Sequence, residues 1–190
     1  MSIEATHSQD RDQDQVQDRD QSVIDRFDEL VDRLFEPLRR SRPLNHIFYS
    51  ASALADHSTV WLILACGQAI THKRSQRGQR ALIALLVESG LVNIVVKTLF
   101  QRERPVQVVE RPLPLRQPLT SSFPSGHATA ATCAAVLLST GNKTDRIVIA
   151  LAALVALSRI HVRIHHASDV AGGIVIGFLY AQIVKRLFPL

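Results

Sequence analysis

The chain has 190 residues, enough for one domain and a tail, and 46% of them are apolar. Its formal net charge of +5 suits anionic partners such as phosphates or acidic lipid headgroups. Nucleic acid fits poorly, because the basic residues interrupt apolar segments instead of lining a polar face.

The first part of the chain is polar. Residues 1–22 are a low-complexity stretch of Asp, Gln and Arg with too little apolar surface to fold, so we predict disorder there. They lack the apolar run of a secretory signal peptide, and we expect internal helices to direct the chain to a membrane. In residues 23–42 the apolar side chains recur every three or four positions. This spacing predicts an amphipathic helix that lies on a membrane surface or packs on the main domain, residues 43–190.

The main domain contains five apolar segments, at residues 51–71, 81–100, 127–140, 147–164 and 170–186. A spanning helix needs about 20 residues, and the third segment reaches that length only with its flanks. The number of segments and their short connections favour a membrane helix bundle over the buried helices of a soluble protein. The predicted fold class is therefore all-α, with about five spanning helices.

Charged residues in the connections predict an orientation. Lys and Arg gather in the links after the first, third and fifth segments, and we expect that side to be cytoplasmic. The loop at 101–126 and the junction at 158–168 then lie on the extracytoplasmic side. The predicted location is the plasma membrane, crossed several times.

Three polar clusters fall on that extracytoplasmic side. They are Lys97 with Arg104-Pro105, the run Pro124-Ser125-Gly126-His127, and Ser158-Arg159 followed by His165 and Asp169. Each cluster alone also fits an ordinary structural role, such as a snorkelling cation, a helix N-cap or a pair on a helix surface.

Taken together, the clusters indicate a phosphate site. The cations Lys97, Arg104 and Arg159 can neutralise phosphoryl oxygens. Ser125 and Gly126, at a helix start, can direct a hydroxyl and backbone N–H groups toward the same anion.

Two histidines remain for the nucleophile and the proton source. If residues 158–169 are partly helical, Asp169 lies one turn from His165 and can fix the tautomer of its ring, leaving the other nitrogen free to attack. His127 is then the candidate acid for the leaving oxygen.

The motifs Lys97-x6-Arg104-Pro105, Pro124-Ser125-Gly126-His127 and Ser158-Arg159-x5-His165-x3-Asp169 resemble the three-part signature of the type 2 phosphatidic acid phosphatase (PAP2) superfamily. The resemblance implies a helical membrane phosphatase domain over residues 43–190. It also implies a phosphohistidine at His165 that Asp169 supports, with His127 protonating the leaving group.

In this family pattern the phosphate is bound by Lys97, Arg104, Ser125, Gly126 and Arg159. No metal or other cofactor is implied. Membrane members often have six spanning helices, whereas five are visible here. The short form is similar to small bacterial members that act on lipid phosphates.

The expected substrate is a lipid phosphate: a polyprenyl phosphate or diphosphate, a polyprenyl-linked phosphosugar, phosphatidic acid or phosphatidylglycerophosphate. Three alternatives remain open. His161, His165, His166 and Asp169 have a spacing that can bind zinc. Soluble acid phosphatases and vanadium haloperoxidases share the anion pocket. A non-catalytic membrane lipid-binding protein is the third alternative.

Overall fold

The computed structural model describes residues 22–190, except for 72–74, 107–110, 117 and 119. Within these ranges every regular element is a helix, which confirms the predicted all-α class. The longer helices are α2 (Val23–Arg39), α3 (Arg42–Leu54), α4 (Thr59–Ile70), α5 (Ser75–Gly90), α7 (Gly126–Leu138), α8 (Asp145–His161) and α9 (Ala167–Leu187). The tail predicted to be disordered lies outside the described residues, apart from Ser22.

Each predicted apolar segment falls on helix, but the first one is not continuous. Helix α3 ends at Leu54 and α4 begins at Thr59, with the short turn η1 (Asp56–Ser58) between them. His57 and Ser58 have positive φ angles of 53° and 60°, which an α-helix does not accommodate. The break turns Asp56 toward the polar end of the bundle instead of leaving it inside a spanning helix.

Two helices in the described part of the chain are long and apolar enough to cross a membrane. One is the 25-residue run Ser75–Leu99, which continues from α5 through η2 (Leu91–Val96) and α6 (Lys97–Leu99). The other is α9, with 21 residues. Helix α7 has 13 residues and would extend only about 20 Å, against roughly 30 Å for the hydrocarbon core. Length and composition thus support two of the five predicted spans.

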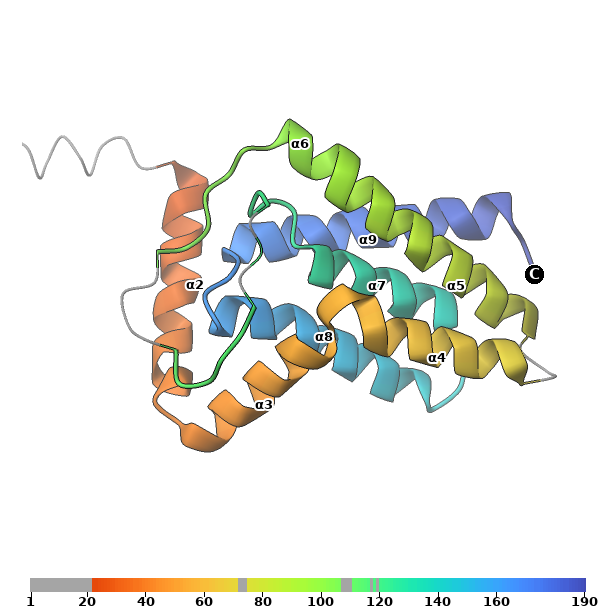
Figure 1. Ribbon diagram of the computed structural model, residues 1–190, viewed down its shortest axis with the longest axis horizontal. Coiled ribbons are helices and arrows are strands. Elements are labelled where there is room, and N and C mark those ends of the chain that lie inside the picture. Colours follow the sequence, from red (N-terminus) through yellow and green to blue (C-terminus); the bar gives the residue numbers. More distant parts are fainter. Residues whose placement is uncertain (1–21, 72–74, 107–110, 117, 119) are drawn as a thin grey trace, which may run out of the picture.

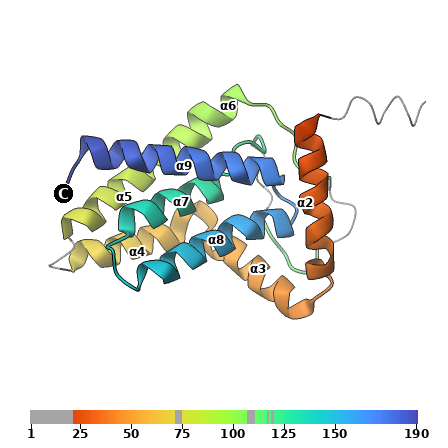
Figure 2. The same cartoon turned by 180° about the vertical axis from the view of Figure 1, so that it is seen from behind.

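Helix α7 lies in the middle of the bundle, with α5, α8 and α9 around it (Figures 1 and 2). Its contact with α9 depends on glycine. A Cβ atom added at Gly177 would lie 2.3 Å from the carbonyl oxygen of Thr129, and one at Gly173 would lie 2.7 Å from that of Ser125. The two backbones therefore touch, and Ser125 N donates a hydrogen bond to the carbonyl oxygen of Asp169 (3.1 Å). This close approach places the start of α7 beside the start of α9.

Helix α2 runs across one end of the bundle, beside the last turn of α8 and the first turn of α9 (Figures 1 and 2). Its own start is closed by a capping box. Ser22 Oγ accepts a hydrogen bond from Asp25 N (3.1 Å), and the Asp25 carboxylate accepts one from Ser22 N (3.2 Å). The helix buries Asp28 against the bundle and half-buries Val31 and Phe35.

The glycine contact between α7 and α9 gives a direct test. Gly177→Ala should lower the free energy of unfolding by about 1–3 kcal/mol, because the new methyl group overlaps the α7 backbone. Thermal unfolding in detergent measures the effect. Gly67→Ala in α4 is the matched control, since a Cβ there meets nothing within 4 Å. An unchanged melting temperature for Gly177→Ala would contradict the close packing.

Candidate active site

The three sequence clusters meet in one cavity of about 450 Å³. Helix α6 contributes Lys97, α7 contributes Gly126 and His127, α8 contributes Arg159, and the junction before α9 contributes His165. The cavity is also lined by residues outside the motifs, among them Asp56, Glu88, Asn93, Arg116 and Thr120.

The side chain of His165 is almost completely buried, and its two ring nitrogens face different partners. Nδ1 lies 3.7 Å from Asp169 Oδ2 and 3.5 Å from Ser122 Oγ. Nε2 lies 3.4 Å from a guanidinium nitrogen of Arg104. The carboxylate therefore favours a proton on Nδ1 and leaves the Nε2 lone pair on the cationic side.

The Asp169 carboxylate that orients this ring is itself held by several donors. Oδ1 accepts a hydrogen bond from Arg102 Nη1 (2.6 Å). Oδ2 accepts from Ser122 Oγ (2.5 Å) and from the backbone N–H of His166 (2.9 Å). With three donors in place, the carboxylate has little freedom to rotate away from His165.

Burial controls the charge of His165, which lies outside the two spanning helices. Loss of hydration lowers its pKa to about 3. The positive charges of Arg159 and Arg104 act in the same direction, and Asp169 opposes them. The ring is therefore neutral at physiological pH, which is the form that can act as a nucleophile.

Arg159, which lines the cavity, and Ser125, next to the lining residue Gly126, carry hydrogen-bonding atoms without partners among the described residues. Arg159 donates through Nη1 to Ser52 Oγ, but its Nε and Nη2 are buried and meet no acceptor among the described residues. Ser125 Oγ is likewise buried and unpartnered within that part of the chain. Buried polar groups nearly always find partners, so this cluster indicates an anion site.

Two further cations, Lys97 and Arg104, are held near the site by different contacts. The Lys97 ammonium lies 3.3 Å from Thr120 Oγ1, and a Cβ added at Gly126 would come within 3.9 Å of it. The ammonium thus faces the start of α7. Arg104 donates to the carbonyl oxygens of Thr120, Ser121 and Ile164, which ties the loop before α7 to the segment that carries His165.

Sequence reasoning did not identify Asp56 as a site residue. Its Oδ1 lies 3.1 Å from His127 Nε2. The interaction with His127 lowers the pKa of Asp56, so this carboxylate stays charged beside the imidazole. The only signal in the sequence was an acidic residue inside an apolar segment. Ser122 and Arg102, which hold Asp169, were also missed.

The histidines proposed for a zinc site have other surroundings. The ring of His161 stacks on Phe48 with centroids 4.3 Å apart, and its Nε2 lies 2.7 Å from Asn45 Oδ1. Among the described residues, no three side chains of His, Cys, Asp or Glu are placed to hold a metal ion together.

Comparison with known proteins places this geometry in a family. The model of the PAP2 superfamily matches residues 79–190, which include all three motifs. The chain belongs to the PAP2 superfamily. This confirms the family predicted from the motifs.

Its relatives are lipid phosphatases. The chain is 33% identical over 158 residues to the decaprenylphosphoryl-5-phosphoribose phosphatase of Mycobacterium tuberculosis (strain ATCC 25618 / H37Rv), covering 83% of this chain and 84% of that protein. The protein of the same name from Mycolicibacterium smegmatis is 33% identical over 124 residues, 64% of this chain and 67% of that protein.

Two solved structures share the fold. The transmembrane PAP2-type phosphatidylglycerolphosphate phosphatase of Bacillus subtilis superposes with a TM-score of 0.66 at 25% identity, covering 88% of this chain and 87% of that one. LpxE of Aquifex aeolicus gives a TM-score of 0.60 at 29% identity, covering 81% and 93%. Together with the family match, these relatives confirm the predicted membrane lipid phosphatase.

The contact between Asp56 and His127 makes a prediction. Asp56→Asn should reduce the turnover number about 10-fold or more, since a positioned acid contributes roughly 10²–10⁴ and depends on a partner that stabilises its charged form. Phosphate release by purified protein in detergent measures the effect. Glu103→Gln, which changes an exposed acidic residue, serves as the control. Equal turnover in the two variants would show that Asp56 does not assist His127.

Proposed function

We propose that the chain hydrolyses a phosphate monoester or diphosphate of a lipid through a phosphohistidine at His165. One observation supports this above all: the cavity that contains neutral His165 is also lined by Arg159, whose Nε and Nη2 have no partner among the described residues, and by Gly126, next to the unpartnered hydroxyl of Ser125. A phosphoryl group would supply acceptors for these donors and would present phosphorus to Nε2. Lys97 and Gly126 line the same cavity. A guanidinium nitrogen of Arg104 lies 3.4 Å from His165 Nε2.

The chemistry then has two steps. In the first, His165 Nε2 forms a bond to phosphorus while the bond to the lipid oxygen breaks, and His127 donates a proton to that oxygen. In the second, water attacks the phosphohistidine, His127 takes a proton from the water, and phosphate leaves. Asp169 stabilises the positive charge on the His165 ring during both steps.

Charge for this reaction comes from side chains. Lys97, Arg104 and Arg159 can balance the phosphoryl oxygens in the role that a metal ion has in other phosphatases. We therefore propose that the enzyme works without a metal or another cofactor.

The proposed substrate class follows from what the relatives share. The mycobacterial proteins are named for a decaprenyl-linked phosphosugar, and the Bacillus subtilis protein for phosphatidylglycerolphosphate. Both substrates carry a terminal phosphate on a membrane lipid. We propose a substrate of this kind: a polyprenyl phosphate or diphosphate, a polyprenyl-linked phosphosugar, phosphatidic acid or phosphatidylglycerophosphate.

The proposed location is the plasma membrane, with the active site on its extracytoplasmic side. Arg77 and Arg80 begin α5, Lys143 and Arg146 join α7 to α8, and Lys185 lies near the end of α9. The ends of α5, α7, α8 and α9 that carry or adjoin these residues lie at the side of the bundle away from α2 and from the junction between α8 and α9, which contains His165 (Figure 1). Clustered basic residues favour the cytoplasmic side.

Helix α2 is proposed to lie in the lipid interface. Val23, Phe27, Leu30 and Leu34 recur every three or four residues and remain exposed. This apolar stripe runs beside the face that packs on the bundle, while charged residues such as Arg26 and Arg33 occupy the outer face. In the membrane interface, one face of the helix would pack on the bundle, the apolar stripe would contact lipid and the charged face would contact water.

The proposal is tested by phosphate release from a panel of these lipids, using purified protein in detergent with EDTA. Wild-type protein should release phosphate from at least one lipid in EDTA. His165→Ala should abolish release, and Asp169→Asn should retain weak activity because it loses only the charge behind the nucleophile. Release that EDTA abolishes, or that persists in His165→Ala, would contradict the mechanism.

A further inference from the structure

Asp28 is a buried carboxylate on α2, far in sequence from the three motifs. It accepts three hydrogen bonds. Arg102 Nη2 donates at 2.6 Å, and the backbone N–H and hydroxyl of Ser168 each donate at 2.7 Å. Each of these donors belongs to a segment that contacts the active site.

Arg102 connects this carboxylate to Asp169. Its Nη1 donates to Asp169 Oδ1 and to Ser168 Oγ, both at 2.6 Å, while its Nη2 is held by Asp28. Burial by itself lowers the pKa of Arg102, but hydrogen bonding and charge from Asp28 and Asp169 outweigh it and raise the pKa. The guanidinium is thus a fixed cation between two buried carboxylates.

The contact between Asp28 and Ser168 also affects the position of Asp169. Ser168 lies in the first turn of α9, next to Asp169, and its N–H is one that the helix itself cannot satisfy. Asp28 therefore holds the start of α9 from outside, as an N-cap side chain would. Two independent contacts, through Arg102 and through Ser168, fix the position of Asp169 relative to α2.

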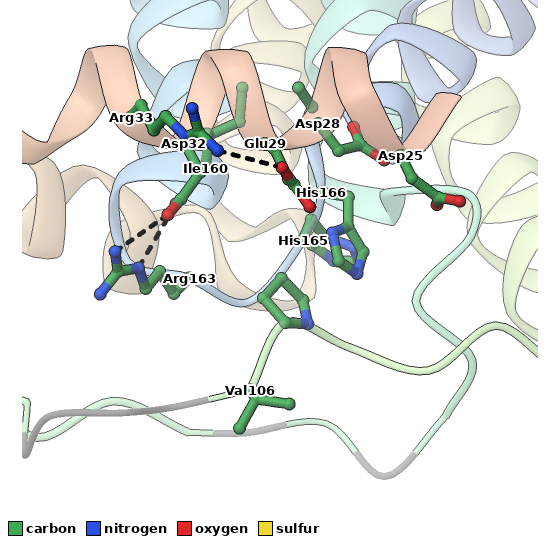
Figure 3. Close-up of a pocket in the computed structure, with 12 residues that line it drawn as sticks. Asp25, Asp28, Glu29, Asp32, Arg33, Val106, Ile160, Arg163, His165 and His166 are labelled. Carbon is green, nitrogen blue, oxygen red and sulfur yellow. Dashed lines mark hydrogen bonds and ion pairs between the residues drawn. The ribbon is translucent and has the colours of Figure 1, made fainter. Parts of the chain in front are cut away.

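Figure 3 shows the residues that line a second cavity, of about 770 Å³, among them Asp28 on α2 and His165. Asp28 and Asp32 lie on α2, which passes over the segment that carries His165 and His166. His165 lines both cavities. The acidic residues of α2 and the nucleophile therefore line the same second cavity.

We propose that Asp28 is a positioning residue for the His165–Asp169 pair, acting through Arg102 and Ser168. The inference rests on the proposed phosphatase mechanism and extends it to α2. Helix α2 then contributes to catalysis, because it fixes the orientation of the Asp169 carboxylate relative to the His165 ring. Neither Asp28 nor Arg102 lines the 450 Å³ cavity, so their contribution falls on turnover and not on substrate binding.

Asp28→Asn tests the proposal, because it keeps the shape of the side chain and removes the charge that holds Arg102. Its turnover number should fall about 10-fold or more, since small misplacements of reacting groups cost up to roughly 10²-fold. Its KM should stay within about 2-fold of wild type, because uniform substrate binding is unaffected. Phosphate release at varied lipid concentration measures both constants.

Asp32→Asn is the matched control. Asp32 lies one turn further along α2 and accepts hydrogen bonds from Arg39 (2.6 Å) and Arg163 (2.9 Å), so it also ties α2 to the bundle. Its described contacts do not include Asp169 or its donors. Turnover by this variant should stay close to that of wild type. Melting temperatures of both variants show whether stability changes equally.

A turnover number for Asp28→Asn equal to that of wild type would overturn the proposal. Equal losses in Asp28→Asn and Asp32→Asn would also overturn it, since α2 would then act only through stability. A rise in KM with unchanged turnover would do the same. If Asp28→Asn does not fold, Ser168→Ala takes its place, with an expected fall in turnover of about 2- to 5-fold at constant KM, and an unchanged rate rejecting the proposal.

The same assay separates this inference from the proposed function. Wild-type protein and His165→Ala are measured in parallel. Activity that persists in His165→Ala would reject the phosphohistidine mechanism, and the positioning role would fall with it. Activity that requires His165 but is insensitive to Asp28→Asn would reject the positioning role alone.

Discussion

The buried carboxylate of Asp169 is the group on which the polar end of this protein depends. A buried charge is costly unless it is paired and hydrogen-bonded. Here the donors come from three places: Arg102 near the start of the loop between α6 and α7, Ser122 near its end, and the backbone of His166. Satisfying one carboxylate therefore draws these segments together. The carboxylate also orients His165, whose Nδ1 faces it. Helix α2 is joined to this network because Arg102 donates a second hydrogen bond to Asp28.

Packing of α7 against α9 places further site residues beside Asp169. Gly173 and Gly177 allow backbone contact, so the start of α7 lies beside Asp169 and presents Ser125 and His127 to the cavity. Near them, Lys97 and Arg159 are buried and Arg104 is half-buried, and the three cations lie close enough for their charges to interact. Like charges in a poorly hydrated site repel, and an anion relieves that repulsion. The proposed affinity for a phosphoryl group thus arises from the way the fold gathers these cations.

The sequence predicted the helical class and the family, because these depend on apolar periodicity and on short motifs. Five of the eight predicted site residues line the cavity: Lys97, Gly126, His127, Arg159 and His165. It did not predict the break at Asp56–Ser58, where His57 and Ser58 have left-handed backbone angles that no glycine or proline signals. It also missed Asp28, Arg102 and Ser122. These residues act through long-range contacts, such as the one between residues 28 and 168, and no local spacing encodes them. The amphipathic pattern of residues 23–42 left two alternatives open, a membrane surface or packing on the main domain. In the structure α2 packs on the bundle while its apolar stripe stays exposed.

The central claim is that His165 is the nucleophile, and trapping the covalent intermediate tests it most directly. Wild-type protein is mixed with a lipid carrying a ³²P-labelled terminal phosphate, quenched within the first turnover, and digested for mass spectrometry. The account predicts a label that is stable to base and labile to acid, located on His165, and absent from His165→Ala. Turnover without a labelled intermediate, or a label on another residue, would contradict it.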